Sequence, residues 1–259
     1  MSVSEPEFLD VDGTNIALRL RKGTQAPGVV WLGGYRSDML GTKAVVLDEW
    51  AEKTGHGALR LDYSGHGESG GDFNDGTISR WLAQSLAVYH AYTEGPQILV
   101  GSSMGGWIAL RMAQELKKQG QSPAGIVLIA PAPDFTSELV EPSLTDAQKR
   151  DLVKKGYFEI PSDYSPNPYV YTRALIEDGQ QNLVLKGIIE TGCPVHILQG
   201  MQDADVPYRH ALKLVEHLPV DDVTLTLVRD GDHRLSRRQN LDLLIRTVSA
   251  LAERVTQTA

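Results

Sequence analysis

Short apolar runs alternate with longer segments of helical period along most of this chain. A strand that is apolar along its whole length must be covered on both faces, and parallel neighbours need a long crossover between them. The alternation therefore predicts an α/β protein with a mostly parallel sheet and helices on both faces. The expected strands lie at 29–32, 58–61, 98–100, 126–130, 195–198 and 223–228, and the expected helices at 42–53, 78–92, 105–118, 208–217 and 238–255.

The chain opens with a different pattern. Two short extended segments, Glu7 to Val11 and Asn15 to Leu20, flank the turn-forming pair Asp12-Gly13. This arrangement predicts an antiparallel hairpin, which brings the expected sheet to eight strands. A chain of 259 residues with 41% hydrophobic content can bury one large core, so we expect a single domain over residues 1–259.

The alternation stops between residues 131 and 191, a stretch too long for an ordinary connection. A helix is expected over 146–155, because Ser143 or Thr145 can cap its start and Gly156 can end it. Open α/β sheets bind ligands at the carboxyl ends of their strands, so we interpret 131–191 as a small cap inserted over that edge. A decorated surface loop without substrate contact is the alternative. Aromatic residues are frequent in this segment: Tyr157, Phe158, Tyr164, Tyr169 and Tyr171.

Charge and composition narrow the classes of partner. The formal net charge of -8, without a long basic run, disfavours a nucleic-acid partner. The single cysteine, Cys193, cannot build a disulfide framework or a zinc cluster, and we expect no metal and no cofactor. The first residues lack the features of a secretory signal or transit peptide, and no apolar stretch is long enough for a membrane span. We therefore expect a cytoplasmic protein, whose oligomeric state the sequence leaves open.

The strongest local signal is Gly101-Ser102-Ser103-Met104-Gly105, which follows an apolar strand and precedes a helix. This context is typical of a nucleophile elbow, where a serine on a strained strand-to-helix turn projects its hydroxyl above the sheet. Small residues two positions before and after the serine allow the tight turn. Ser103, at the centre of the pattern, is therefore the candidate nucleophile. The amino end of the helix that follows favours developing negative charge beside it.

A serine hydroxyl is a weak nucleophile until a base accepts its proton, and the base needs a carboxylate to orient it. His233 lies in the loop between the last expected strand and the last expected helix, and it is the candidate base. His66 and His210, in loops near strand ends, are weaker candidates.

The candidate acid follows the expected strand at 195–198. Residues 200–207 have the pattern Gly-x-x-Asp-x-x-Val-Pro, which resembles the acid loop of many α/β-hydrolases and selects Asp203. Asp205 is the competing acid, or it caps the helix that starts near Pro207. The order of serine, acid and histidine along the chain is the order of that fold.

Two donors are needed to stabilise the oxyanion that forms when a carbonyl is attacked. The elbow supplies the backbone N–H of Met104, and the loop after the strand at 29–32 offers the backbone N–H of Tyr35. Gly33 stands where many α/β-hydrolases carry a histidine, so a side chain that often braces this loop is missing. The expected oxyanion hole therefore consists of two backbone donors.

The segment 60–69, Arg-Leu-Asp-Tyr-Ser-Gly-His-Gly-Glu-Ser, also resembles a recurring α/β-hydrolase loop. Its glycines suit a tight turn after a strand, so we expect a structural role. A phosphate cradle at Gly65 or Gly67 is disfavoured, since no Lys-Ser or Lys-Thr pair follows.

Together these segments resemble one branch of the α/β-hydrolases, the palmitoyl-protein thioesterases that are also described as mycophenolic acid acyl-glucuronide esterases. The resemblance runs from about Leu20 to the C-terminus. It implies the α/β-hydrolase fold, the triad of Ser103, Asp203 and His233, and hydrolysis of carboxylic ester or thioester bonds through an acyl-enzyme. The segments that carry it are Gly34-Tyr35, Met39 to Ala44, Arg60 to Gly65, Gly95 to Trp107, Gly200 to Pro207 and Asp232 to Arg234.

The same resemblance implies two substrate classes, S-palmitoylated cysteines of proteins and acyl-glucuronide esters. Trp107, beside the elbow, and the cap residues Tyr157 and Phe158 are candidates for an acyl pocket, although an aromatic beside an elbow equally often belongs to the core. Members of this branch are associated with mitochondria and carry a leader that this sequence lacks, so the expected location stays cytoplasmic.

Several alternatives stay open. Arg234, Arg237 and Arg238 can receive an anionic leaving group, or they can form a solvated start of the last helix. Dehalogenation and epoxide opening usually rely on an aspartate at the elbow, where this chain has Ser103. A C–C bond hydrolase, a perhydrolase and a noncatalytic ligand-sensing protein of the same fold are compatible with the triad.

Overall fold

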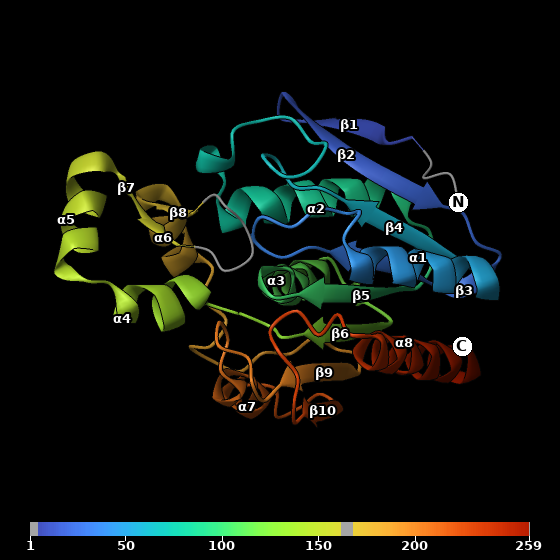
Figure 1. Ribbon diagram of the computed structural model, residues 1–259. Coiled ribbons are helices and arrows are strands. Elements are labelled where there is room, and N and C mark those ends of the chain that lie inside the picture. The colour runs from blue at the N-terminus through green and yellow to red at the C-terminus, as the bar shows by residue number, and fades with distance from the viewer. Residues whose placement is uncertain (1–4, 162–167, 259) are drawn as a thin grey trace.

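The computed structural model describes residues 5–161 and 168–258, so Tyr164 of the expected cap lies outside the described residues. An eight-stranded sheet has the order β1-β2-β4-β3-β5-β6-β9-β10 (Figure 1). β2 pairs antiparallel with β1 and β4, and all other neighbours are parallel, so the expected mostly parallel sheet is confirmed. The strands are β1 Glu7–Val11, β2 Thr14–Arg21, β3 Gln25–Leu32, β4 His56–Leu61, β5 Gln97–Ser102, β6 Gly125–Ile129, β9 Val195–Gly200 and β10 Val223–Val228.

Helices follow the strands as the periodicity predicts. The longer ones are α1 Thr42–Thr54, α2 Ile78–Tyr92, α3 Met104–Lys118, α7 Tyr208–Glu216 and α8 Arg238–Thr258. The opening hairpin turns at Asp12 and Gly13, whose φ angles of 52° and 79° are both positive. That conformation is the one a two-residue hairpin loop requires, which explains the Asp-Gly pair.

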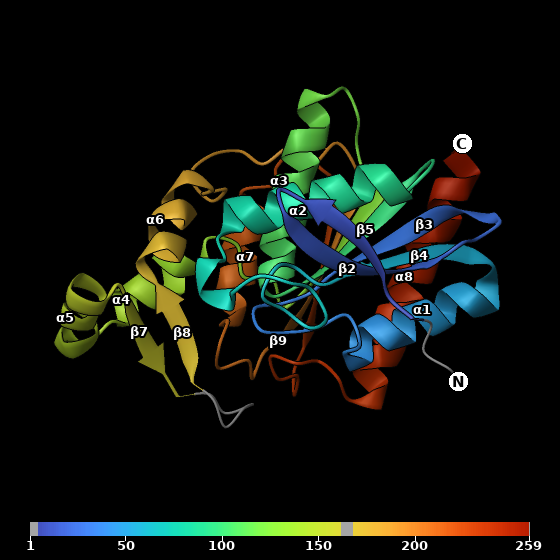
Figure 2. The ribbon, with the colours of Figure 1, turned by 90° about the horizontal axis from the view of Figure 1, so that it is seen from above.

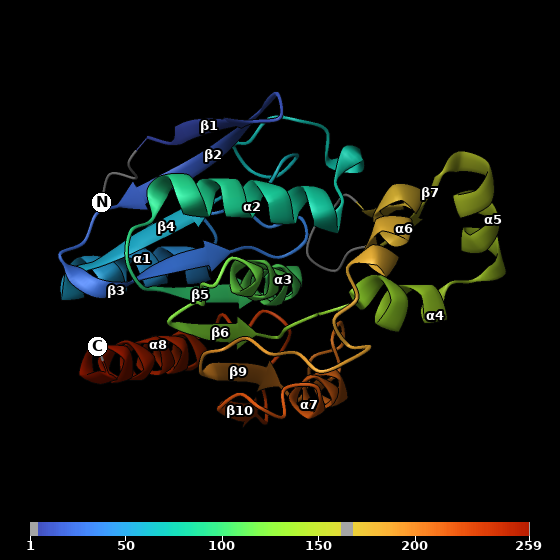
Figure 3. The ribbon, with the colours of Figure 1, turned by 180° about the vertical axis from the view of Figure 1, so that it is seen from behind.

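Two separate cores form because successive side chains of a strand point to opposite faces of the sheet. Val30 and Leu32 of β3 belong to a buried cluster with residues of α2, α3 and α7. Val29 and Trp31 belong to a second cluster with residues of α1 and α8. Figure 3 views the molecule from the side of α2 and α3. The helices therefore cover both faces of the sheet.

After β6 the chain leaves the sheet and returns to it only at β9. Figure 2 shows the intervening elements gathered at one end of the sheet, away from both termini. A short antiparallel sheet, β7 with β8, lies among the helices. The elements of this segment are a π-helix at Thr136–Val140, α4 Glu141–Ser143, α5 Asp146–Lys155, β7 Tyr157–Ile160, β8 Tyr169–Thr172 and α6 Arg173–Gln181.

Helix α5 has the boundaries that the sequence predicts. Thr145, rather than Ser143, is the N-cap, and it forms a capping box with Gln148. Gly156 ends the helix with a φ of 81°, a left-handed conformation that glycine adopts without strain. Local capping chemistry thus determines where this helix begins and ends.

Among residues 5–161 and 168–258, no helix is both long and apolar enough to cross a bilayer. Cys193 is buried, and burial raises the pKa of its thiol to about 11. A thiol in this state is a poor nucleophile at neutral pH, because the reactive thiolate is scarce.

Candidate active site

The turn between β5 and α3 has the backbone geometry of a nucleophile elbow. Ser103 has a φ of 53° and a ψ of -118°, a combination that a side-chain-bearing residue rarely adopts. The N–H of Ser103 donates to the carbonyl of Ile129 at 2.9 Å, and its carbonyl accepts from Gly106 and Ala132. These bonds stabilise the strained backbone of the turn. In this turn the Ser103 side chain is partly exposed, whereas that of Ser102 is buried.

The glycines of the elbow are required by close backbone packing. A Cβ on Gly101 would lie 2.4 Å from the carbonyl oxygen of Gly105, within the elbow itself. A Cβ on Gly105 would lie 2.0 Å from the carbonyl oxygen of Leu32, at the end of β3. Neither distance is possible for a real side chain, so both positions need glycine.

Ser103, His233 and Asp203 form a continuous chain of hydrogen bonds. The Ser103 hydroxyl lies 3.1 Å from Nε2 of His233, and Nδ1 of His233 lies 2.8 Å from Oδ2 of Asp203. The Asp203 side chain is fully buried, whereas that of His233 is 17% exposed. Since a carboxylate only accepts, Nδ1 carries the proton and Nε2 is left to accept from the serine hydroxyl.

The carboxylate of Asp203 is held by several donors besides His233. Its Oδ1 accepts from the N–H groups of Asp205 and Val206 at 3.0 and 2.8 Å. Its Oδ2 also accepts from Nε2 of Gln199 at 3.1 Å, a buried side chain that sequence reasoning did not single out. A carboxylate with this many donors is fixed in orientation, which in turn fixes the imidazole.

Asp205 has a different position from Asp203. It lies in the lining of a cavity beside Ser103, where burial raises the pKa of Tyr171 and the charge of the Asp205 carboxylate adds to the effect. Helix α7 has Pro207 at its N-cap, and this residue makes no side-chain cap bond. The carboxylate within hydrogen-bonding distance of Nδ1 of His233, at 2.8 Å, is that of Asp203.

The loop that carries His233 is anchored on both sides. A Cβ on Gly200 would lie 2.4 Å from the carbonyl oxygen of Gly231, so the acid loop and the base loop are in close backbone contact. Nζ of Lys43, from α1, donates to the carbonyl of Arg234 at 2.5 Å. Burial lowers the pKa of Lys43 to about 8, with the nearby Arg234 guanidinium adding to the effect. Lys43, like Gln199, belongs to no sequence pattern that would predict this role.

The two weaker candidates for the base lie in other environments. His66 is buried, with Nδ1 3.1 Å from the carbonyl of Ser64 and Nε2 3.1 Å from the N–H of Arg36. His210 is also buried, and its Nε2 lies 2.8 Å from the carbonyl of Pro133. Both rings bond to the backbone rather than to Ser103.

The loop after β3 lies directly against the elbow. A Cβ on Gly34 would lie 3.3 Å from the Cβ of Ser103 and 4.0 Å from its hydroxyl oxygen. Tyr35 and Met104, the expected sources of oxyanion donors, both line the cavity that contains Ser103 and His233. The Tyr35 hydroxyl donates to the carbonyl of Val170 in β8, which links this loop to the segment between β6 and β9.

The cavity beside Ser103 has a volume of about 400 Å³. Apolar and aromatic side chains dominate its wall. Tyr35 and Tyr171 stack with their rings 5.4 Å apart and 4° from parallel. Besides Ser103, Met104, His233 and Tyr35, the lining residues are Ala132, Phe135, Leu139, Val140, Ser143, Ile160, Pro161, Tyr169, Tyr171, Ala204, Asp205 and Val206.

The three residues suggested for an acyl pocket do not line this cavity. Trp107 is fully buried in the core, and its indole N–H donates to the carbonyl of Asn182 at 3.0 Å. Phe158 is buried against Tyr171, with ring centroids 5.3 Å apart, and Tyr157 is 40% exposed. Ile160 of β7 and its neighbours Tyr169 and Tyr171 of the paired strand β8 line the cavity instead. Leu139 and Val140 come from the π-helix, and Phe135 is the residue just before it; this segment has no recognisable sequence pattern.

The arginines after His233 are outside the cavity lining as well. Arg237 pairs with Asp230 at 2.8 Å, on the surface of the same loop. Ligand atoms of Asp203, Asp205 and His233 lie within 4.8 Å of one another, a spacing that a metal ion can accept. Both ring nitrogens of His233 already form hydrogen bonds, Nδ1 with Oδ2 of Asp203 and Nε2 with the hydroxyl of Ser103. The arrangement therefore fits proton transfer better than metal binding.

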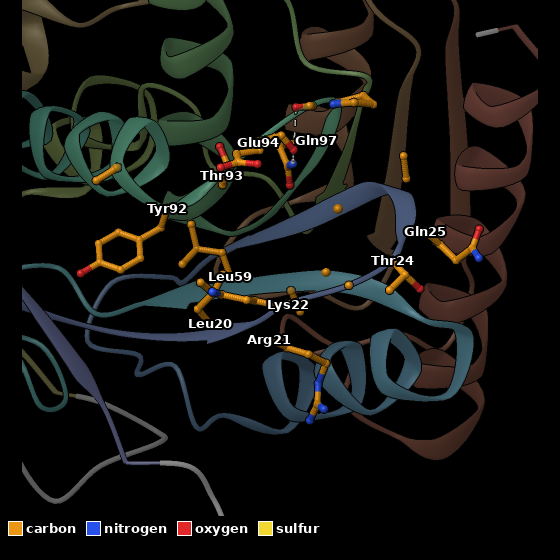
Figure 4. A pocket seen from close by; sticks show the side chains of 18 of the residues that line it. Leu20, Arg21, Lys22, Thr24, Gln25, Leu59, Tyr92, Thr93, Glu94 and Gln97 are labelled. Atoms are coloured by element: carbon orange, nitrogen blue, oxygen red, sulfur yellow. Dashed lines mark hydrogen bonds between the residues drawn. The ribbon is translucent and has the colours of Figure 1, made fainter.

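A second cavity, of about 660 Å³, lies at the opposite edge of the sheet (Figure 4). It is lined by the turn between β2 and β3 and by the segment from Tyr92 to Gln97, at the start of β5. None of Ser103, Asp203 and His233 is part of it. The larger cavity is therefore separate from the chain of hydrogen bonds.

Comparison with known proteins adds an independent line of argument. The chain matches the family described as Alpha/beta hydrolase family over residues 27–245. It is 33% identical over 242 residues to palmitoyl-protein thioesterase ABHD10, mitochondrial, from Mus musculus, and the alignment covers 93% of this chain and 80% of the mouse protein.

Solved structures of hydrolases are also similar to this chain. A putative hydrolase from Agrobacterium vitis S4 superposes with a TM-score of 0.93 and 57% identity, covering 96% of this chain and 98% of the other. Alpha/beta hydrolase domain-containing protein 10 from mouse superposes with a TM-score of 0.87 and 31% identity, covering 97% of this chain and 100% of the other. The similarity thus extends over the elbow, the acid loop and the base loop alike.

Proposed function

The chain belongs to the alpha/beta hydrolase family, and from that premise we propose that it hydrolyses acyl thioesters and esters through an acyl-enzyme on Ser103. His233 is the general base in this proposal, and Asp203 orients it. The observation that carries the proposal is the pair of hydrogen bonds, 3.1 Å and 2.8 Å long, that joins these three side chains. A nucleophile, a base and an orienting group within bonding distance are the requirements for covalent catalysis.

Acyl transfer follows from these contacts. As the Ser103 oxygen attacks the carbonyl carbon of the substrate, its proton moves to Nε2 of His233 and the carbonyl oxygen becomes an oxyanion. When the tetrahedral species collapses, His233 returns the proton to the leaving thiol or alcohol, and the acyl group stays on Ser103. Water then attacks the acyl-enzyme with the same base, which releases the carboxylic acid and restores the serine.

Two backbone N–H groups are proposed to stabilise the oxyanion. Met104 supplies one at the amino end of α3, where the helix dipole also favours negative charge. Tyr35 supplies the other, since it lines the same cavity as Ser103 and the residue before it, Gly34, lies so close that a Cβ there would be 3.3 Å from the Cβ of Ser103. Donors of this kind act on the transition state rather than on the bound substrate, so they raise kcat.

The proposed substrate is a thioester with a long or aromatic acyl group, such as an S-palmitoylated protein cysteine. The wall of the cavity beside Ser103 is largely apolar and aromatic, which suits an acyl group that leaves water on binding. Relatives at about one-third identity are named palmitoyl-protein thioesterases. The segment 131–191 is proposed as a cap, because its residues Phe135, Leu139 and Tyr171 form much of that wall.

A fluorophosphonate probe and a substrate panel test the proposal together. The wild-type protein should be labelled on Ser103, and acyl thioesters of graded chain length should be hydrolysed with a kcat/KM that rises with acyl length. The matched control is a panel of oxygen esters with the same acyl groups. A protein that binds these compounds without labelling or turnover would instead be a ligand-sensing member of the family.

A cytoplasmic location is also part of the proposal. The mammalian relatives are named mitochondrial, so the two locations need a direct comparison. Expression of the full chain with a C-terminal fluorescent tag, followed by fractionation, would distinguish them. Enrichment with an organelle fraction would contradict the cytoplasmic assignment.

A further inference from the structure

The loop that follows β4 packs against the loop that carries Tyr35. Oδ1 of Asp62 accepts from the N–H of Met39 at 2.7 Å, and Arg60 donates to the carbonyl of Met39 at 3.1 Å. Asp62 is buried and uses its other oxygen to accept from the N–H of Glu68 at 2.9 Å. These bonds join the two loops at a point several residues beyond Tyr35.

Two further contacts flank Tyr35 itself. The hydroxyl of Tyr63 donates to the carbonyl of Gly33 at 3.1 Å, and Nε2 of His66 accepts from the N–H of Arg36 at 3.1 Å. Tyr63 is 1% exposed and His66 is 3% exposed, so water does not compete for either bond. The backbone on both sides of Tyr35 is therefore held by side chains of the same neighbouring loop.

The hydrogen bonds of His66 define its protonation. A backbone N–H can only donate, so Nε2 of His66 must be an unprotonated acceptor toward Arg36. The carbonyl of Ser64 can only accept, so Nδ1 carries the proton. Burial, with the Arg36 guanidinium adding to it, lowers the pKa of His66 to about 4, which keeps the ring neutral at neutral pH.

Arg36 needs this support because its backbone is strained. Its φ of 58° lies in the left-handed region, which a long side chain adopts only when its surroundings hold it there. The Arg36 guanidinium lies over the ring of Phe73, with 4.7 Å to the centroid, and the N–H of Ser37 donates to the carbonyl of Gly34 at 3.1 Å. Gly33 has no side chain that could stabilise the loop. The hydrogen bonds from Tyr63 and to His66 stabilise its backbone instead.

We propose that His66 and Tyr63 are positioning residues, which hold the backbone from Gly33 to Arg36 so that the N–H of Tyr35 is aimed at the oxyanion. This inference rests on the proposed function, since it concerns a donor of that reaction. It gives the segment 60–69 a part in transition-state stabilisation rather than a purely structural one. Neither side chain is part of the lining of the cavity beside Ser103.

Three variants separate positioning from general stability. His66→Leu removes the acceptor for Arg36, His66→Gln retains an acceptor near the place of Nε2, and Tyr63→Phe removes only a hydroxyl. His56→Leu is the matched control, because Nδ1 of His56 also lies 2.9 Å from a backbone carbonyl, that of Pro27, at the opposite edge of the sheet. Each protein is measured per fluorophosphonate-labelled active site, so that only folded enzyme is counted.

The readouts are kcat, KM and the inhibition constant of an alkyl boronic acid, which forms a tetrahedral anionic adduct with an active serine. His66→Leu should lower kcat by about 100-fold, in the range measured when an oxyanion donor is lost, with KM nearly unchanged. The boronic acid should bind more weakly by the same factor. Tyr63→Phe should cost about tenfold, the size of one hydrogen bond. His66→Gln should recover most of the loss, and His56→Leu should behave as wild type.

Two kinds of failure are distinguishable. If the wild-type protein is neither labelled nor active, the proposed function fails and this inference fails with it. If the wild-type protein is active but His66→Leu keeps its kcat, only the inference is overturned. It is also overturned if kcat falls while the boronic acid binds as before, or if His66→Gln is as impaired as His66→Leu. Should His66→Leu not fold, Tyr63→Phe and His66→Gln decide by the same two measurements.

Discussion

The two edges of the central sheet carry cavities that differ in size and in chemistry. The amino edge has the larger cavity (Figure 4), of about 660 Å³, and the carboxyl edge has the smaller one, of about 400 Å³. At the amino edge the polar groups bond to their own surroundings: Gln97 donates to the carbonyl of Glu94 at 2.8 Å, and Arg21 pairs with Asp48 at 2.9 Å. At the carboxyl edge they converge on Ser103. Convergence of polar groups, rather than volume, marks a reactive site.

The topology explains this difference. In a parallel sheet flanked by helices, each strand points its carboxyl end at the start of the next helix, so helix amino ends gather at one edge. Helix α3 therefore begins at Met104, beside the nucleophile, while α2 ends at Tyr92, in the wall of the larger cavity. The partial charge of a helix is positive at its amino end and negative at its carboxyl end. An oxyanion is favoured at the first edge and disfavoured at the second.

The strongest test of the comparison removes the nucleophile. Ser103→Ala should lower kcat by about 10⁶-fold, the size found when a triad serine is lost, because no other group can form the acyl-enzyme. Steady-state turnover of a thioester measures the effect. Ser102→Ala, one residue away with a buried side chain, is the matched control and should be far milder. Substantial activity of Ser103→Ala would move the reaction to another site, with the larger cavity as the next candidate.

The next largest effect concerns the acid. Asp203→Asn should lower kcat by about 10⁴-fold, because an amide at this position favours the wrong tautomer of His233. Asp205→Asn, in the cavity wall, should retain most of the activity. Single-turnover kinetics of both variants measure the chemical step directly. If the two variants ranked in the opposite order, Asp205 would be the orienting acid.

A third test uses pH, since the carboxyl edge contains a buried neutral histidine. The pKa of His66 is lowered to about 4 in the folded protein, whereas an unfolded chain has a histidine pKa of about 6.5. Between these values the unfolded state binds more protons, so the free energy of unfolding should fall as pH drops from about 6.5 to 4. The loss should total about 3 kcal/mol.

This pH dependence can be isolated by difference. Burial also lowers the pKa values of His196 and His210, but both residues are present in wild type and in His66→Gln. Urea unfolding of the two proteins at a series of pH values should therefore show a steeper acid decline in wild type. Parallel curves would mean that the pKa of His66 is the same in the folded and unfolded states, contrary to its burial and its bond with Arg36.

The smallest expected effect comes from filling each cavity in turn. Leu139→Trp should reduce kcat/KM for a palmitoyl thioester by roughly tenfold, because added bulk in the cavity wall displaces the acyl group. The same variant should affect an acetyl thioester less. Glu94→Trp, which adds similar bulk to the larger cavity, should leave both substrates within about twofold of wild type. Equal losses from the two variants would contradict the separation of the edges.

The features of this protein that follow local rules can be predicted from its amino-acid sequence. The periodicity of the apolar residues predicts six strands of the sheet and its long helices, because burial on both faces imposes that spacing, and the Asp12-Gly13 turn predicts the remaining two strands. Thr145 and Gly156 set the ends of α5 through capping. The elbow at Ser103 was recognisable because close backbone packing admits only glycine at its two ends.

Which side chains come into contact depends on the three-dimensional arrangement of the strands and helices. Trp107 stands four residues after Ser103 in the chain, yet helix α3 turns it into the core, whereas Tyr171 reaches the cavity from a distant strand. The bond between His66 and Arg36 joins two loops that follow neighbouring strands, β4 and β3, although 30 residues separate them in sequence. Contacts of this kind depend on strand order and side-chain direction, and no local pattern records either of them.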